Sequence, residues 1–169
     1  MPKVFSDTQV NKDDIRVYGR KNNQRTWKFI SNKYVRRNDN LSHYKVFITG
    51  ANGSGKLGEQ LSKPIVAKPN ECHTQTFMSI GNFSTEIEAK NFEKYIYTKF
   101  LRFMLGTLKV TQNNPKDTWA NIPLLDFSNN SEIQWHKPVS EIDKQLYSKY
   151  GLSDEEILFI EETSEDMVK

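Results

Sequence analysis

The sequence predicts a single α+β domain in which a mixed or antiparallel sheet packs on one long buried helix, with two short helices at the C-terminal end. Short runs of β-branched and aromatic residues separated by turn residues occupy the first 80 positions, as is typical of strands. A helical apolar period then runs from residue 85 to residue 108, and capping signals follow at Ser140 and Ser153. The length of 169 residues is that of about one ordinary domain.

Residues 1–43 are predicted to form a basic connector that contains the first strands. Cations alternate there with aromatic side chains: Arg16, Arg20, Lys21, Arg25, Lys28, Lys33, Arg36 and Arg37 with Tyr18, Trp27, Phe29 and Tyr34. This composition suits a surface for a phosphate backbone with occasional base stacking. It equally suits an amphipathic pair of strands, with residues 26–30 as one of them, and both interpretations stay open.

Residues 44–139 are predicted to form the core. Residues 44–49 read as a strand, the glycine-rich residues 50–58 as a loop, and residues 64–67 and 75–80 as further strands, with a turn at Gly81-Asn82. Residues 119–127 are expected to be extended, because Pro123 restricts them to an edge strand or a loop, and residues 128–138 to form a loop.

The central helix is predicted from Thr85 onward, because Thr85 and Glu88 have the spacing of a capping box. Apolar residues recur at three- and four-residue steps: Ala89, Phe92, Ile96, Phe100 and Phe103, joined later by Leu101, Met104, Leu105 and Leu108. A helix that is apolar nearly all round is usually buried, so the domain is expected to fold around its second half. A polar run, residues 111–114, follows and ends at Pro115.

Residues 140–169 are predicted to form an acidic helical pair. Ser140 begins the first helix, and Gly151 stands in the usual C-terminal glycine position. Ser153 and Glu156 form a second capping box for a helix that extends to about Met167. Acidic outer faces do not suit a helix that reads a DNA groove, so the pair is interpreted as a structural or docking element.

The charges are segregated along the chain. Residues 1–116 contain 20 Lys/Arg and 9 Asp/Glu, whereas residues 117–169 contain 4 and 12. This predicts a basic surface for a polyanion, unless the two parts lie together and neutralise each other. A single cysteine excludes an internal disulfide. The sequence has no apolar run of about eighteen residues and no signal-peptide pattern, so a cytoplasmic protein without a membrane partner is expected.

Residues 50–57 match the spacing of a phosphate-binding loop, which makes a nucleotide-binding protein one alternative. Leu57, however, stands where the motif needs a magnesium-binding Ser or Thr, and Pro64 leaves no room for the long helix that the motif requires. A glycine loop whose amides meet a DNA phosphate uses the same geometry and is preferred.

No catalytic set is evident. Cys72 and His73 lack metal-ligand spacing with the other histidines, and Glu88-Ala89-Lys90 lies at a helix start rather than in a nuclease strand. The chain is therefore predicted to be non-catalytic, with no cofactor or metal of its own.

Four runs carry a resemblance: FITGANGSGKLGEQLSKPIVAKPNE, HTQTFMSIGNF, FLRFMLGTLKVTQNNPKDTWANIPLLDF and EIDKQLYSKYGLSDEEILFIE. Together they resemble, over residues 44–162, the C-terminal region of bacterial type II restriction–modification adenine-specific DNA methyltransferases, in which methylation and cleavage are fused. The resemblance implies a target-recognition domain that binds duplex DNA. The cofactor loop and catalytic NPPY of these enzymes are missing. S-adenosylmethionine and catalysis are therefore expected in a separate N-terminal methyltransferase/nuclease part, from which this chain would be a fragment.

A recognition domain needs phosphate contacts for position and base-edge contacts for sequence choice. The chemistry of the side chains predicts the first role for lysines and the loop serine, and the second for exposed amides. The residues expected to contact DNA are Lys45, Asn52, Ser54, Lys56, Lys63, Gln75, Lys109, Gln112, Asn113, Asn114 and Lys116. Each amide could instead be a turn or capping residue, above all Asn113 and Asn114 before Pro115. A third possibility is a protein-interaction module that uses the acidic C-terminal helices.

Overall fold

The computed structural model describes residues 4–36, 38–51, 56–108 and 116–167, without the side chain of Lys116. Its elements are, in order, β1 (Ile15–Lys21), β2 (Gln24–Ile30), η1 (Asn32–Tyr34), η2 (Asp39–Ser42), β3 (Tyr44–Thr49), β4 (Ile65–Ala67), β5 (Glu71–His73), β6 (Phe77–Phe83), α1 (Glu86–Tyr97), α2 (Lys99–Leu108), α3 (Lys116–Trp119), α4 (Val139–Lys149) and α5 (Asp154–Thr163).

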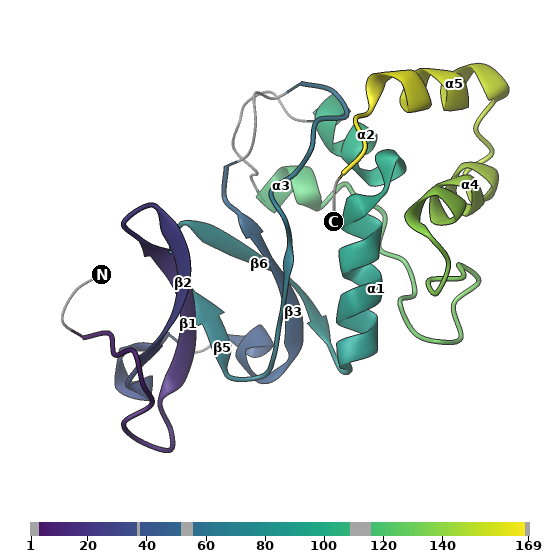
Figure 1. Ribbon diagram of the computed structural model, residues 1–169. Helices are drawn as coiled ribbons and strands as arrows, with labels where there is room; N and C mark the ends of the chain where they lie inside the picture. Colours follow the sequence, from purple (N-terminus) through teal and green to yellow (C-terminus); the bar gives the residue numbers. More distant parts are fainter. Residues whose placement is uncertain (1–3, 37, 52–55, 109–115, 168–169) are drawn as a thin grey trace.

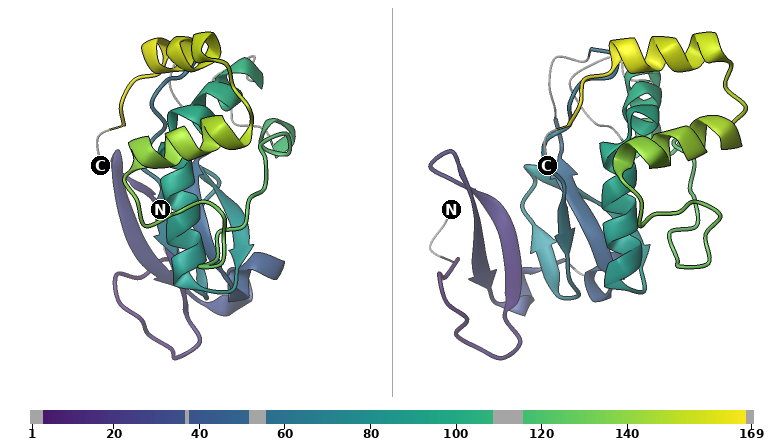
Figure 2. Two further views of the ribbon diagram at one scale, coloured as in Figure 1. Left: turned by 90° about the vertical axis from the view of Figure 1, so that its right-hand side faces the viewer. Right: turned by 45° about the vertical axis from the view of Figure 1, so that its right-hand side comes forward.

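The strands form two three-stranded sheets, and α1, α2, α4 and α5 lie on one side of them (Figure 1). In the outer sheet β1 pairs antiparallel with β2 and parallel with β5. In the inner sheet β3 pairs antiparallel with both β4 and β6. Figure 2 shows the inner sheet between the outer sheet and α1, with α4 and α5 beyond α1. The α+β class predicted from the sequence is confirmed.

Strand β3 is buried on both faces, which places it at the centre of the layers. Successive side chains of a strand point to opposite faces. Val46 and Ile48 belong to the large apolar cluster that includes the helices, whereas Phe47 packs in a second cluster with Tyr18 of β1 and Phe77 of β6. The second cluster joins the two sheets, so the segment before residue 44 is integrated with the core.

The single long helix expected after Thr85 is not confirmed, because the backbone breaks at Thr98. Thr98 is extended, with φ −65° and ψ 144°, and separates α1 from α2. Its hydroxyl donates to the Tyr95 carbonyl (2.6 Å) and accepts from the Leu101 amide (3.2 Å). The Asp143 carboxylate of α4 accepts from the first two amides of α2, at 3.1 and 3.0 Å. A distant side chain thus caps α2, and the apolar period continues across the break without marking it.

The turn expected at Gly81-Asn82 is instead a β-bulge inside β6. The pairing passes from Val46–Ile80 to Tyr44–Phe83, so that Gly81 and Asn82 together lie opposite Lys45. Gly81 has φ 93°, a conformation that other residues rarely adopt. Gly81 does mark an irregular backbone position. The strand accommodates it as a bulge of one extra residue and continues to Phe83.

The C-terminal helices follow the sequence closely. Both capping boxes form, at Thr85–Glu88 and at Ser153–Glu156, and Gly151 has φ 64°. Helix α5 ends at Thr163, earlier than expected, because Ser164 becomes extended and buried. Residues 120–127 form no strand. Among the described residues no helix has the length and apolarity needed to cross a membrane.

We predict that Gly81→Ala lowers the free energy of unfolding by more than Gly151→Ala. A Cβ at Gly81 would lie 2.1 Å from the Phe83 ring, whereas at Gly151 no atom lies within 4 Å. Both substitutions place alanine at positive φ, which alone costs about 1–2 kcal/mol. Chemical denaturation of the two variants measures the difference, and equal losses would contradict the close approach of Gly81 to the Phe83 ring.

We predict a pH-dependent effect of Asp143→Asn. Burial raises the pKa of Asp143 to about 6, although hydrogen bonds from the Phe100 and Lys99 amides oppose the shift. The folded state therefore binds this proton more tightly than the unfolded state. As the pH rises from about 4 to about 6, the free energy of unfolding of the wild type should fall by up to about 3 kcal/mol relative to that of the variant. Unfolding at a series of pH values tests this, with Glu141→Gln as an exposed control on α4; parallel wild-type and Asp143→Asn profiles would contradict it.

Candidate nucleic-acid interface

The tip of the β1–β2 hairpin concentrates positive charge. Asn22 and Asn23 have φ values of 50° and 60°, as the two central residues of a type I′ hairpin turn require. Arg20 lies directly opposite Arg25, followed by Lys21, and all three side chains are exposed. None forms an ion pair with an acidic residue in the part of the chain that the structure describes. Like charges directly opposite in a sheet are destabilising, so this arrangement is not explained by stability.

Two other segments reach the same end of the sheets. The Thr74 amide donates to the Tyr18 carbonyl of β1 (2.9 Å), and the Gly50 amide, after β3, donates to the Thr76 carbonyl (3.0 Å). These bonds place the exposed Gln75 between the hairpin and the end of β3. The guanidinium of Arg25 lies 5.9 Å from the Phe77 ring centroid, at the start of β6 (Figure 1).

Lys63 lies at this end as well. The neighbouring Ser62 hydroxyl is 2.8 Å from the Thr49 hydroxyl at the end of β3, and the Lys63 side chain is exposed. We call this surface the basic end and define it by Arg20, Lys21, Arg25, Lys63 and Gln75. It brings together two of the residues predicted to contact DNA, Lys63 and Gln75.

Other cations of the first 43 residues serve the fold. Arg16 pairs with Glu71 at 2.9 Å and lies 4.4 Å over the Trp27 ring. Lys28 is buried and pairs with Asp7. These residues form an amphipathic strand pair. The Trp27 ring contacts both the Arg16 guanidinium and the Tyr18 ring, so these contacts already occupy part of its surface.

The acidic C-terminal segment does not cover the basic end. Asp166 and Glu161 pair with Lys99 of α2, at 3.3 and 2.8 Å. The Glu165 carbonyl accepts from the buried Arg102, which also donates to the Gly58 carbonyl (2.8 Å). The cations that these acidic residues meet are therefore on α2, and the hairpin tip keeps its charge.

Lys45 must be withdrawn from the predicted DNA contacts, because its side chain is buried, with 1% exposed. On β3 it shares the face of Phe47 and points between the two sheets. Its ammonium donates to the carbonyls of Leu41 (3.2 Å), His43 (3.0 Å) and Lys68 (2.9 Å). Burial lowers the pKa of Lys45 to about 8, although the Glu71 carboxylate opposes the shift. With its donors occupied, this lysine stabilises the fold.

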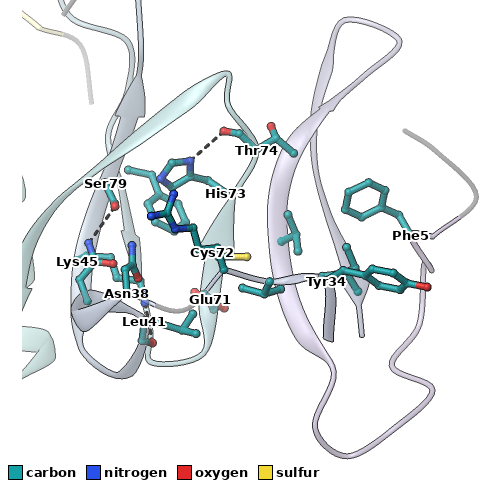
Figure 3. Close-up of a pocket in the computed structure, with 16 residues that line it drawn as sticks. Phe5, Tyr34, Asn38, Leu41, Lys45, Glu71, Cys72, His73, Thr74 and Ser79 are labelled. Carbon is teal, nitrogen blue, oxygen red and sulfur yellow. Dashed lines mark hydrogen bonds between the residues drawn. The ribbon is translucent and has the colours of Figure 1, made fainter. Parts of the chain in front are cut away.

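A cavity of about 300 Å³ lies beside Lys45, between the sheets, and Cys72 and His73 line it (Figure 3). Adjacent on a strand, these two side chains point to opposite faces, and Figure 3 shows them diverging. Burial raises the pKa of the Cys72 thiol to about 11 and lowers the pKa of His73. The His73 Nδ1 atom lies 2.9 Å from the Thr74 carbonyl oxygen. The pair does not have the geometry of a thiolate and its base.

The remaining predicted residues are distributed elsewhere. Lys56 is exposed and lies beside α2, because the Leu57 backbone packs against Gly106. Lys116 begins α3. The other predicted contacts lie outside the described residues: Asn52, Ser54, Lys109, Gln112, Asn113 and Asn114. Residues 56–64 form no helix, so the helix N-terminus of a phosphate-binding loop does not follow Lys56.

The residues expected from the sequence to contact DNA do not include Arg20, Lys21 and Arg25. Their signal is the Asn22-Asn23 dipeptide, which favours a tight hairpin turn and therefore brings the flanking cations opposite one another. Without the register, these residues could not be separated from Arg16 and Lys28. Within the described ranges, no three His, Cys, Asp or Glu side chains gather as metal ligands.

Comparison of the chain with protein-family models, with curated proteins and with solved structures gave no match.

We predict that Lys45 is at least about tenfold slower than Lys63 to react with an acetylating reagent in the folded protein, because the inner sheet must open first. The lowered pKa of Lys45 would by itself make its amine more reactive, so slow reaction reports burial. Mass spectrometry of acetylated peptides measures both rates. The denatured chain is the control, in which both lysines should react; equal rates in the folded protein would contradict the burial.

Proposed function

We propose that this chain binds duplex DNA through the basic end and acts, without catalysis of its own, as the target-recognition domain of a restriction–modification adenine methyltransferase in the cytoplasm. The observation that carries the DNA-binding proposal is the exposed pair Arg20 and Arg25, directly opposite each other on a hairpin. The negative charge of a polyanion at the tip would offset the repulsion between the two guanidinium groups and attract both of them. The assignment to restriction–modification enzymes rests on the resemblance of residues 44–162.

A two-stranded β-ribbon fits the major groove of B-DNA, where every base pair presents a distinct pattern of donors and acceptors. The tip of the β1–β2 hairpin is such a ribbon, because residues 19–21 pair with residues 24–26 beyond the part of β1 that pairs with β5. Arginine donates in a bidentate manner to guanine, and glutamine pairs with adenine. We therefore assign base reading to Arg20, Arg25 and Gln75, and phosphate contacts to Lys21 and Lys63. Each bidentate contact contributes about 1–3 kcal/mol of discrimination.

The catalytic steps are assigned to a separate part of the enzyme. The cysteine and histidine of the inter-sheet cavity do not form a nucleophile and base, and the buried Lys45 is bound to carbonyls. S-adenosylmethionine would accordingly be bound by an N-terminal methyltransferase part, which this domain would direct to its DNA site.

The test is fluorescence anisotropy with a pool of labelled duplexes, titrated over a series of salt concentrations from low salt. For the wild type, the logarithm of the binding constant should fall linearly with the logarithm of the salt concentration. The double variant Lys21→Gln/Lys63→Gln should bind more weakly, and its salt slope should be smaller by roughly two, because two phosphate contacts are removed.

The matched control is Lys137→Gln/Lys144→Gln, which removes the same charge from exposed lysines next to and on α4. Its affinity and slope should equal those of the wild type. Absence of binding at low salt would contradict the proposal. Equal losses of affinity in the two double variants would also contradict it, because DNA binding would then depend only on the net charge of the chain. Circular dichroism confirms that each variant is folded.

A further inference from the structure

Residues of α2 and α5 line an apolar groove. Both helices lie on the side of the molecule away from the outer sheet (Figures 1 and 2). The floor of the groove is made of buried Phe100 and Ile160, and its walls are apolar side chains of both helices. The seven residues that line it are Phe100, Phe103, Met104, Leu152, Glu156, Phe159 and Ile160. We propose that this groove binds a basic amphipathic helix of a partner protein.

The apolar walls are more exposed than stability requires. The side chain of Phe159 is 55% exposed, although its ring meets that of Phe103 edge-on at 5.7 Å. Isolated exposed leucines are ordinary, but aromatic and methionine side chains gathered along a concave surface are typical of a binding site. Met104 adds a side chain that adapts to different partners.

The charged side chains of α5, which forms one wall of the groove, all have the same sign. Helix α5 carries five carboxylates and no cation along its ten residues. Glu156 lines the groove itself, and the exposed Glu155 and Glu162 lie about two turns apart on α5. Asp154, Glu155 and Glu162 form no ion pair with any residue that the structure describes. An acidic rim repels nucleic acid, so this surface does not extend the basic end.

A helix is the occupant that this shape and charge select. The groove lies between two neighbouring helices, α2 and α5. A third helix can insert apolar residues at i, i+3, i+4 and i+7 into such a groove. Lysine or arginine on the flanks of that helix would face the unpaired carboxylates of α5, which adds specificity and a faster association rate. The cations of α1, α2 and α4 already bind groups within the described fold. They are Lys90, Lys94, Lys99, Arg102, Lys144 and Lys149.

The probe is a synthetic helical peptide of about 18 residues with leucine at i, i+3, i+4 and i+7 and lysine at the flanking positions. Two comparison peptides replace every lysine by glutamate, or every leucine by serine. Binding of each labelled peptide to the full chain is measured by fluorescence anisotropy. The lysine–leucine peptide should bind, and the other two should bind at least about tenfold more weakly.

Three variants locate the site. Phe159→Ser should weaken binding of the lysine–leucine peptide at least about tenfold. Glu155→Gln/Glu162→Gln should weaken it and reduce its salt dependence, without removing an apolar contact. The control Leu124→Ser changes a side chain that is 87% exposed outside the groove, and its affinity should equal that of the wild type.

Several outcomes would overturn the proposal. Equal binding of the glutamate peptide would remove the role of charge, and equal binding of the serine peptide would remove the role of the groove. Unchanged affinity in Phe159→Ser would place the peptide elsewhere. Concentration-dependent self-association of the chain in sedimentation, abolished by Phe159→Ser, would show that a second copy occupies the groove instead.

Discussion

The buried ammonium of Lys45 begins a chain of polar contacts that connects the inner sheet to the outer sheet. A charge in the interior is costly unless hydrogen bonds satisfy it, and here three carbonyls do so. One of them belongs to Lys68, whose amide donates to the Glu71 carboxylate (2.8 Å), which in turn pairs with Arg16 of β1. This chain of polar contacts runs from the inner sheet to the outer sheet beside the aromatic cluster of Tyr18, Phe47 and Phe77. The position of the hairpin, and with it the basic end, depends on both.

The helical side is held by a second set of buried polar contacts. Asp143 of α4 caps α2, and Arg102 of α2 donates to carbonyls in the segment before β4 and in the C-terminal segment. Tyr147 donates to Glu161 of α5 (2.9 Å). These bonds fix α2, α4 and α5 relative to one another, so the groove between α2 and α5 has rigid walls. Two surfaces of opposite charge therefore lie on one scaffold, the basic end on the sheets and the acidic groove on the helices.

The separation of charge follows from which residues find partners within the fold. Arg16, Lys28, Lys45, Lys99 and Arg102 are neutralised or buried close to their own elements. The hairpin-tip cations Arg20, Lys21 and Arg25 and the α5 carboxylates Asp154, Glu155 and Glu162 have no ion-pair partner among the described residues. The hairpin and α5 lie in different layers (Figure 1). This arrangement suits a domain that holds DNA on one side and a protein segment on the other, which is the combination of functions that we propose.

Local sequence determined the elements whose signals lie within a few residues of each other. The strand at residues 44–49, both capping boxes and the glycine after α4 were predictable, because alternation and capping act over short distances. The break at Thr98 was not, since the carboxylate that caps α2 comes from Asp143, 45 positions after Thr98. Nor was the burial of Lys45, because only the approach of the outer sheet encloses it. The site shows the same division: the sequence contained the cations, but the pairing register decided which of them face each other and which are bound inside.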